Sequence, residues 1–409
     1  MRVLFTNTFY YPNMMGGAEQ SVKLLAEGLV KCGHDVAVYA GDAENDACSV
    51  ETYNGVTVYR YNTGKFNLYR YSYQKEKVGK FEKITQKLLT YYNYISLKNF
   101  QEVCKEFKPD VIHSNTLYGI PCTIWKEAQN QGIPVLHTVR DTAIESPVQY
   151  GHPVNVIIKL LHKIYMRYYS SFANAVIAPS EYTLTNTLHI GAFKHAVVKR
   201  CIYNCVDIDI LKIVSNIEER KHRTDSEIKF MYAGRLIELK GIRTMISAFN
   251  ALADERTLLY ICGAGEMEDY VKESVQKNSR IIYCGKLRND ELEEKYKECD
   301  VLIVPSEWPE PFGRVVIEGN KYGMPVICTN CGGIPEIINE MHGGEMYDAK
   351  DSKSLVKWMK FFSNRRVYRK YWENIINGIE IFDVRRQIEK YMNAYLTIAD
   401  GGRKNANRK

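Results

Sequence analysis

The chain has 409 residues, of which 45% are hydrophobic and 25% charged, with a formal net charge of +7. This length exceeds one ordinary hydrophobic core, so two domains are expected. The absence of any run of 18 apolar residues argues against a transmembrane helix. The mild basic excess suits an anionic substrate or an acidic membrane surface, and no nucleic-acid motif accompanies it.

Cysteine usage and the first residues both predict a cytoplasmic protein. The eleven cysteines are an odd number without a disulfide framework, as in a reducing compartment. The opening MRVLFTNTFYYPN turns polar too quickly for a signal peptide and is expected to form a strand. Cys328 and Cys331 have metal or redox spacing, but no second pair or His cluster joins them, so two small residues at a strand end are favoured.

Apolar runs alternate with helical periodicity through residues 1–215, which predicts a first Rossmann-like domain. After the first strand, Val22, Leu25 and Leu29 recur at helical spacing up to Gly33, a suitable C-cap. The strands are expected at RVLFTNTF, HDVAVYAG, VTVYRYN, DVIHSN, IPVLHTVRD and NAVIAPS.

A second alternating series follows a charged stretch. Residues 216–227, NIEERKHRTDSE, are expected to be a linker, and residues 228–382 a second Rossmann-like domain. A helix over 383–399 is expected to return to the first domain, and the basic tail 400–409 to be disordered. The second set of strands is expected at IKFMYAGRL, TLLYICGAG, RIIYCGKL, VLIVPS and PVICTN.

The predicted fold class is therefore α/β, with two doubly wound domains facing a central cleft. In open parallel sheets, ligands bind at the carboxyl ends of the strands. The residues that carry the chemistry are thus expected in loops just after strands, and the candidate motifs fall there.

The string SEWPEPFGRVVIEG follows the buried strand VLIVPS. Its two prolines and glycine require a loop, which places Glu310 at the cleft, and the next residues form a helix with Glu318 about one turn inside it. Carboxylates accept hydrogen bonds from sugar hydroxyls well, so one acid can hold a hexose and the other a ribose. The third acid, Glu307, is expected to be solvated.

The start of this helix is a candidate anion site. The amides of Phe312, Gly313 and Arg314 have no partner within the helix and lie at the positive end of its dipole. A diphosphate could lie against them, between the two acids.

Two further motifs follow the first strand of each domain. GRLIELKG offers Arg235 and Lys240, which could hold a diphosphate, although a solvated pair at a helix entry is an equal alternative. MMGGAEQ places Gly16 and Gly17 at a helix start, where an anion could approach the backbone, or where they form a plain glycine turn. The Gly-x-Gly-x-x-Gly fingerprint is missing, which disfavours a nicotinamide cofactor.

The sequence at this point resembles glycosyltransferase family 4, whose members are retaining enzymes of the GT-B fold. The resemblance covers nearly the whole chain, and its most specific part is the spacing of the two acids with seven residues between them. It is carried by GGAE, PDVIHSN, GIPVLHT, VIAPSEYT, YNCVD, GRLIELKG, EPFGRVVIEG and GMPVICTNCGGIPEII.

The resemblance implies a role for each motif. Arg235 and Lys240 would contact the donor diphosphate, Glu310 the donor sugar, and Glu318 the ribose. Glu310, Arg235 and Lys240 would form the catalytic set. The backbone from Gly285 to Leu287 would meet the base, Phe312 and Gly313 would belong to the donor site, and Gly16 and Gly17 would approach the sugar phosphate from the first domain.

Three departures from the family pattern stand out. Cys205 replaces a common glycine, and Arg140, followed by Asp141, stands where many members carry a histidine near the transferred sugar. Arginine cannot act as a base but can stabilise negative charge or bind an acceptor. Asp207 and Asp209 imitate the Asp-x-Asp of metal-dependent transferases but lie at the domain junction, so no metal is expected.

Two stretches suggest contact with an anionic membrane. Residues 65–98 are rich in Lys and Tyr, and NVIIKLLHKIYMRYY reads as a basic amphipathic helix. A domain helix with a solvated basic side is an equal alternative. The basic residues of that helix are Lys159, Lys163 and Arg167, and the apolar ones are Ile157, Leu160, Leu161 and Ile164.

These observations predict a retaining hexosyltransferase that moves a sugar from a nucleoside diphosphate to a glycan or polyprenyl-linked glycan. Bacterial surface polysaccharide synthesis, such as lipopolysaccharide or capsule, would be its setting, with no cofactor beyond the donor. A non-hydrolysing sugar-nucleotide epimerase ranks lower, because it would not need the two spaced acids. The main alternative is a non-catalytic subunit that binds a nucleotide sugar or a glycan, which only Arg140 favours.

Overall fold

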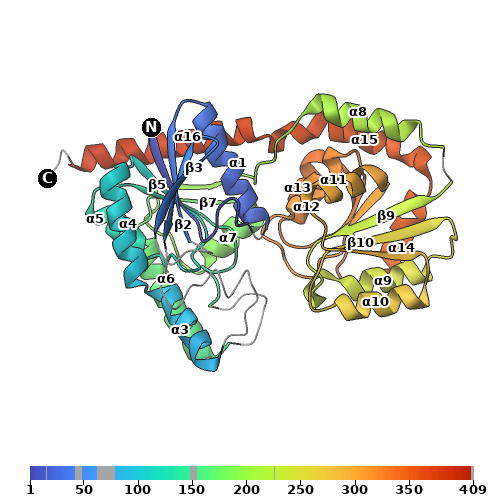
Figure 1. Cartoon of the computed structure of the whole chain (residues 1–409), viewed down its shortest axis with the longest axis horizontal. Helices are drawn as coiled ribbons and strands as arrows, with labels where there is room; N and C mark the ends of the chain where they lie inside the picture. Colours follow the sequence, from blue (N-terminus) through green and yellow to red (C-terminus); the bar gives the residue numbers. More distant parts are fainter. Residues whose placement is uncertain (15, 42–47, 62–78, 148–153, 225, 407–409) are drawn as a thin grey trace. The chain divides into compact units, whose positions relative to one another are not determined.

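The chain folds into two compact units. A computed structural model describes residues 1–14, 16–41, 48–61, 79–147, 154–224 and 226–406 (Figure 1). Unit 1 contains Met1–Cys205 together with Val384–Lys409, and unit 2 contains Val206–Asp383. Among the described residues, no helix is long and apolar enough to cross a membrane.

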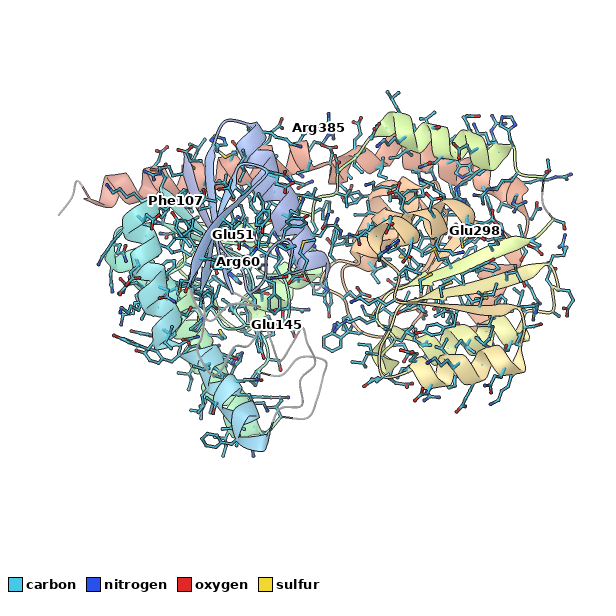
Figure 2. The ribbon with its side chains drawn as sticks, viewed as in Figure 1. Glu51, Arg60, Phe107, Glu145, Glu298 and Arg385 are labelled. Carbon is cyan, nitrogen blue, oxygen red and sulfur yellow. The ribbon has the colours of Figure 1, made fainter. Side chains whose placement is uncertain are left out.

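Unit 1 is built on an eight-stranded sheet in the order β3-β4-β2-β1-β5-β6-β7-β8. Every neighbouring pair is parallel except β3 and β4, which the Arg60–Glu51 ion pair of 2.9 Å also joins (Figure 2). The strands are β1 (Arg2–Thr6), β2 (Asp35–Gly41), β3 (Ser49–Tyr53), β4 (Val56–Tyr61), β5 (Val111–Ser114), β6 (Val135–Thr138), β7 (Ala175–Ala178) and β8 (Val198–Cys201).

Helices cover both faces of this sheet, because side chains of a strand alternate between the two faces. Val3 and Phe5 of β1 belong to one core, with α1 and α16, while Leu4 belongs to the other, with α4, α5 and α6. The helices are α1 (Gly17–Lys31), α3 (Lys80–Tyr91), α4 (Tyr94–Phe107), α5 (Thr123–Asn130), α6 (Val156–Ser170), α7 (Glu181–His189) and α16 (Val384–Ala406).

Unit 2 is built on a six-stranded, all-parallel sheet in the order β11-β10-β9-β12-β13-β14. The strands are β9 (Ile228–Ala233), β10 (Thr257–Cys262), β11 (Ile281–Gly285), β12 (Val301–Val304), β13 (Val326–Thr329) and β14 (Gly344–Tyr347). Both sheets are doubly wound and parallel apart from the β3–β4 pair, and the predicted α/β fold class is confirmed.

Helices again lie on both faces, with α9, α10 and α14 on one and α11 to α13 on the other (Figure 1). The α-helices are α8 (Ile210–Lys221), α9 (Ile242–Ala251), α10 (Glu268–Lys277), α11 (Asn289–Glu298), α12 (Arg314–Lys321), α13 (Ile334–Met341), α14 (Ser352–Phe362) and α15 (Tyr368–Gly378). Three 3₁₀ turns, η2 (Glu238–Lys240), η3 (Arg365–Val367) and η4 (Ile379–Phe382), complete the unit.

The prediction of a linker at residues 216–227 is wrong. Residues 216–221 belong to α8, and the division between the units falls after Cys205. One face of this charged stretch packs against the rest of unit 2, and Ile217 on it is buried. Arg220 is 4% exposed, and its guanidinium donates to the carbonyls of Tyr296, Cys299 and Tyr322. Burial lowers the pKa of Arg220 to about 9, and Arg223 adds to this.

The predicted disorder of the tail is also wrong for part of its length. Helix α16 belongs to unit 1 and continues to Ala406, while residues 407–409 lie outside the described residues. The stretch 400–406 contains no proline, so backbone hydrogen bonds can extend the helix beyond the buried residue Ile398.

Candidate active site

The candidate site of unit 2 lies at the switch point of its sheet. The chain leaves β9 toward β10 on one side, whereas β12 adds on the other side of β9. A crevice forms where the strand order reverses in this way, and ligands bind there at the carboxyl ends of the strands. The loops after β9 and β12 carry GRLIELKG and SEWPEPFG respectively.

Backbone contacts hold these two loops against each other. Both amides of Glu307 and Trp308 donate to the Leu239 carbonyl, at 2.9 and 3.0 Å. Gly241 has φ +69°, and a Cβ there would stand 1.9 Å from the Pro305 carbonyl oxygen. Only glycine therefore permits this approach, and it lies directly beside Lys240.

Lys240 and Glu310 meet across the loops. Lys240 Nζ lies 2.8 Å from Glu310 Oε1, and the two side chains are 19% and 16% exposed. The pair brings together two of the three residues predicted as the catalytic set. Because it is largely shielded from water, it is less screened than a surface ion pair.

The backbone of Glu310 is fixed from a third strand end. Its carbonyl accepts a hydrogen bond of 2.8 Å from the Gly333 amide, in the loop after β13. Gly332 has φ +64°, and a Cβ there would lie 2.5 Å from the Glu310 nitrogen and 2.4 Å from its oxygen. Two glycines of the CGG motif, Gly332 and Gly333, thus hold the backbone of Glu310 in place.

Glu307 is not solvated, contrary to the prediction. Its side chain is 17% exposed, and Oε1 accepts a 2.7 Å hydrogen bond from the Thr244 hydroxyl of α9. The loop turns Glu307 inward because its own amide is held by Leu239. This acid therefore fastens the β12 loop to α9.

Arg235 is exposed at the end of β9. The Tyr232 hydroxyl donates to the Arg235 carbonyl at 2.8 Å, which sets the direction of the backbone there. Burial raises the pKa of Tyr232 far above its usual range, and the negative charge of Glu310 adds to this. Tyr232 thus remains a neutral donor between Arg235 and the acid.

The ends of β10 and β11 continue the same edge. A Cβ on Gly263 would stand 1.8 Å from the Gly234 carbonyl oxygen, and the Gly263 amide donates to the Gly285 carbonyl at 2.8 Å. Gly285 has φ +71° with nothing within 4 Å of its Cβ position, and Leu287 is half-buried two residues on. The residues predicted to meet the base thus lie at one sheet edge with Arg235.

Helix α12 begins at the capping residue Gly313, whose φ is +91°. Phe312 is buried, and a Cβ on Gly313 would stand 2.6 Å from Ile334 of α13. Glu318 is 34% exposed and pairs with Arg314, Nε to Oε1 2.8 Å. A ligand hydroxyl that reaches Glu318 would therefore meet a carboxylate already oriented by an arginine.

In unit 1, Gly16 and Gly17 stand at the start of α1 and are exposed. The Gly16 amide donates to Glu19 Oε2 at 2.9 Å. Glu19 is 6% exposed, and burial raises its pKa, while Arg140 opposes this and Asp141 adds to it. The sequence analysis missed Glu19, although the acid of GGAE at the third helical position was a capping signal.

Arg140 lies within a polar cluster at the ends of β5 and β6. Its Nε donates to Asn115 Oδ1 at 3.1 Å, and its Nη1 donates to Asn204 Oδ1. Asp141 Oδ1 accepts from the Ala143 amide at 2.8 Å, and burial raises the Asp141 pKa. Neither asparagine was predicted, although Asn115 ends DVIHSN and Asn204 stands within YNCVD, two of the strings that carry the family resemblance.

A buried network lies beneath this cluster. His113 donates or accepts at both nitrogens, with Nδ1 2.6 Å from the Tyr395 hydroxyl and Nε2 2.7 Å from Thr138 Oγ1. The Thr138 hydroxyl also lies 3.3 Å from the Tyr391 hydroxyl. Burial, helped by Arg140, lowers the His113 pKa well below its usual range. Helix α16 therefore touches β5 and β6 directly under Arg140.

The candidate metal motifs have structural partners. Cys328 is buried at the end of β13, and Asp209 caps α8, with Oδ1 accepting from the Lys212 amide at 3.2 Å. Within the described ranges, no group of three His, Cys, Asp or Glu side chains is placed to hold a metal ion.

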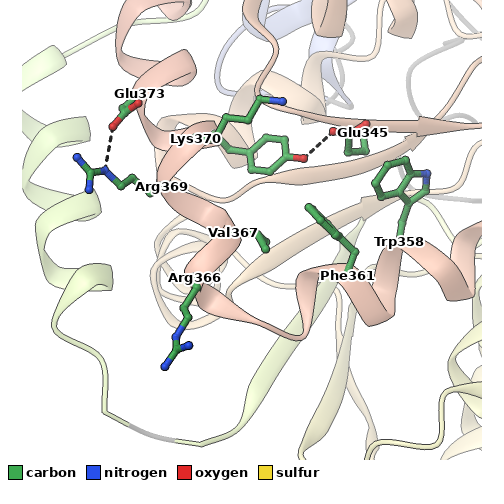
Figure 3. Close-up of a pocket in the computed structure, with 9 residues that line it drawn as sticks. Glu345, Trp358, Phe361, Arg366, Val367, Arg369, Lys370 and Glu373 are labelled. Carbon is green, nitrogen blue, oxygen red and sulfur yellow. Dashed lines mark hydrogen bonds and ion pairs between the residues drawn. The ribbon is translucent and has the colours of Figure 1, made fainter.

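A pocket of about 560 Å³ lies elsewhere in unit 2, at the β14 edge of the sheet (Figure 3). Trp358 and Phe361 line it, and Tyr371 donates to Glu345 Oε1 at 2.6 Å on its wall. None of the residues predicted for the reaction lines it.

Curated relatives align with most of this chain. An uncharacterized 42.6 kDa protein in the cps region of Klebsiella pneumoniae is 29% identical, over 82% of this chain and 87% of its own length. The O-antigen chain mannosyltransferase C of Escherichia coli is 22% identical, over 98% of this chain and 99% of its own.

Solved structures share the fold over the whole chain. Sucrose-phosphate synthase from Thermosynechococcus elongatus has a TM-score of 0.77 at 18% identity, covering 98% of this chain and 99% of that one. Anabaena HepE in complex with UDP has a TM-score of 0.69 at 18% identity, covering 97% and 100%.

Two family models match successive parts of the chain. Residues 15–210 match the model described as Glycosyltransferase Family 4, and residues 214–377 match the model described as Glycosyl transferases group 1. The junction between the two matches falls close to the division between the units. Together the matches span most of the sequence, and the chain therefore belongs to the group 1 glycosyltransferases of family 4.

Proposed function

We propose that this glycosyltransferase moves a hexosyl unit from a nucleoside-diphosphate sugar to a glycan or lipid-linked glycan, with retention of the anomeric configuration. The setting would be the synthesis of bacterial surface polysaccharide. The relatives in a cps region and in O-antigen synthesis support this setting. The UDP bound by HepE supports a nucleotide donor.

The observation that carries the proposal is the Lys240–Glu310 pair at the switch point of unit 2. The pair puts an ammonium group and a carboxylate, which can accept hydrogen bonds from hydroxyls, 2.8 Å apart at the place where the sheet forms a crevice. A sugar diphosphate needs this combination, because its phosphates require positive charge and its sugar hydroxyls require acceptors. Without donor, each side chain neutralises the other.

In the proposed reaction, the bond from the anomeric carbon to the diphosphate oxygen breaks, and the acceptor oxygen bonds to that carbon. Negative charge then grows on the leaving phosphate. Arg235, Lys240 and the amides at the start of α12 would stabilise it, because fixed donors need no reorganisation as the charge develops. The leaving phosphate would take the proton of the acceptor hydroxyl, which attacks from the same face.

The acceptor side is assigned to unit 1. Arg140 cannot remove a proton, but its guanidinium, held by Asn115 and Asn204, can hold an anionic acceptor group. Asp141 lies next to it in the chain, and its carboxyl oxygens can accept hydrogen bonds from acceptor hydroxyls. No metal is needed in this scheme, since the cations of unit 2 oppose the diphosphate charge.

The donor is tested first, by screening nucleotide sugars for thermal stabilisation of the full chain. A ligand of the native state must raise the apparent stability, by about 2.7 kcal/mol at 100 times its Kd. Arg235→Ala should abolish the shift. Arg256→Ala is the matched control, because Arg256 is also an exposed arginine of unit 2 but pairs with Asp254 away from the site.

Turnover then separates the transferase from a non-catalytic binding subunit. With a stabilising donor in hand, release of the nucleoside diphosphate is measured with glycan acceptors, for the wild type and for Glu310→Gln. Turnover that falls at least 100-fold in the variant supports the proposal. Donor binding without turnover over the acceptor panel would favour the binding subunit, and no shift at millimolar donor would contradict both.

A further inference from the structure

Among the described residues, α6 carries more exposed large apolar side chains than any other helix. The fold does not bury the apolar face of this helix, although the sequence alone allowed it to be a core face. The exposed fractions of six apolar residues in the first half of α6 run from 50% to 79%. They are Val156, Ile157, Ile158, Leu160, Leu161 and Ile164.

The core contact of α6 lies on its opposite side. His162, Met166 and Ser170 are its buried residues, at four-residue spacing, and the His162 ring accepts or donates toward the Tyr91 hydroxyl at 2.9 Å. Residues 157, 160, 161 and 164 recur at the spacing of a single helical stripe, and at about 100° per residue that stripe lies opposite His162 and Met166. The helix is therefore apolar toward solvent as well as toward the core.

Positive charge flanks this stripe. Lys163 and Arg167 lie toward one side of it, whereas Lys159 lies toward the buried side of the helix, near Met166. Helix α6 contains no acidic residue. An apolar stripe beside a basic row is the pattern of helices that lie in the headgroup region of anionic bilayers. Long lysine stems can keep their ammonium groups at the headgroups while apolar neighbours enter the acyl boundary.

A second helix of unit 1 adds to this surface. Phe81, Ile84 and Leu88 of α3 are 58–76% exposed and recur at helical spacing. The end of α3 is joined to α6, because the ring of Tyr91 packs edge-on against Tyr165 with centroids 5.0 Å apart. Part of the Lys- and Tyr-rich stretch predicted for membrane contact, residues 65–78, lies outside the described residues.

We propose that the stripe of α6 inserts into the surface of an anionic lipid bilayer. This inference rests on the proposed function, because inserting the stripe would bring unit 1 to an acceptor that is anchored in lipid. A second copy of the chain fits the stripe less well. A twofold contact would bring the same patch of each copy together, and with it two acid-free basic rows.

The test is flotation of the full chain with vesicles of phosphatidylglycerol and phosphatidylethanolamine, against vesicles of phosphatidylcholine alone. Leu160→Ser with Leu161→Ser should weaken binding to the anionic vesicles by roughly tenfold or more per leucine. Lys163→Gln should weaken it about fivefold. Leu211→Ser and Val197→Ser are matched controls, since both residues are more than 70% exposed but lie off α6.

The outcomes are separable. Loss of flotation in the α6 variants with the controls unchanged supports the proposal, provided that the variants unfold at the wild-type temperature. Failure of the wild type to float on anionic vesicles overturns it, and so does equal flotation of all variants. A dimer in lipid-free solution that the leucine variants dissociate would assign the stripe to a second copy instead. Each of these results is independent of whether the donor binds, so the proposed function is judged separately.

Discussion

Replacing Gly241 by alanine should disconnect the two loops of the donor site. Gly241 stands at φ +69°, and its Cβ would lie 1.9 Å from the Pro305 carbonyl oxygen. The left-handed backbone alone costs roughly 1–2 kcal/mol for a residue with a side chain. The overlap adds to this, because the gap must open by about 1.5 Å, from 1.9 to the 3.4 Å of an ordinary contact.

That opening acts on the chemistry through Lys240. It precedes Gly241 in the chain, and its Nζ lies only 2.8 Å from Glu310 Oε1. A displacement of about 1 Å at a reacting centre can lower the rate roughly 100-fold. We therefore expect kcat/KM to fall by about two orders of magnitude in Gly241→Ala, with weaker donor binding, in a protein that still folds.

The control is Gly132→Ala. Gly132 has φ +72° with nothing within 4 Å of its Cβ position, so it bears the backbone cost without the overlap. Donor titration, initial rates and thermal unfolding are measured for both variants. A Gly241→Ala protein that turns over within fivefold of wild type would refute the coupling between the loop contact and the ion pair, and so would an equal loss in Gly132→Ala.

Three further predictions concern single side chains. Glu318→Gln should weaken binding of the nucleoside diphosphate about tenfold, since a hydrogen bond to a charged group is stronger than one to a neutral group. A donor analogue that lacks the ribose should bind equally to the variant and the wild type. Calorimetric titration measures both affinities, and unchanged affinity for the nucleoside diphosphate would remove Glu318 from the site. Tyr395→Phe should destabilise unit 1 by about 1 kcal/mol, because His113 loses the hydroxyl that lies 2.6 Å from its Nδ1. Urea unfolding measures this loss, and a change in donor affinity instead would give the hydroxyl a different role. Burial lowers the His137 pKa to about 3, and Arg140 lowers it further. The unfolded state therefore binds more protons below pH 6.5, and the free energy of unfolding should fall by about 1.4 kcal/mol per pH unit from this group as the pH falls from 6.5 toward 3. The slope of unfolding free energy against pH should become shallower in His137→Gln, and an unchanged slope would contradict the assignment.

The sequence predicted the strands that the cores require. Each strand proposed from an apolar run is present, because such runs are buried on both faces of a parallel sheet. The strands it missed, β3, β8 and β14, lie at the edges of the two sheets. Edge strands have a solvated side, and β8, Val-Lys-Arg-Cys, shows how little apolar pattern such a strand needs.

For the candidate site, the residues near strand ends could be predicted from the sequence, but their partners could not. Lys240 and Glu310 are 70 positions apart, and their contact depends on the register of two loops that no local pattern encodes. The same limit explains Glu307, whose hydrogen bond from Thr244 needs the fold to be known. For α6 the sequence left two alternatives open, because periodicity identifies an apolar face without saying whether the core or another partner covers it.

Unit 1 is assembled from both ends of the described chain, with unit 2 inserted between them. During synthesis on the ribosome, residues 206–383 emerge before α16 does, so unit 2 can fold first. Unit 1 has to wait, because buried His113 lacks one of its two hydroxyl partners, and the core around Phe5 lacks the side chains of α16, until Tyr395 has emerged. A nascent chain stalled before residue 384 would therefore expose a hydrophobic sheet face, a natural target for chaperones. Unit 1 would become complete only after α16 has been synthesised.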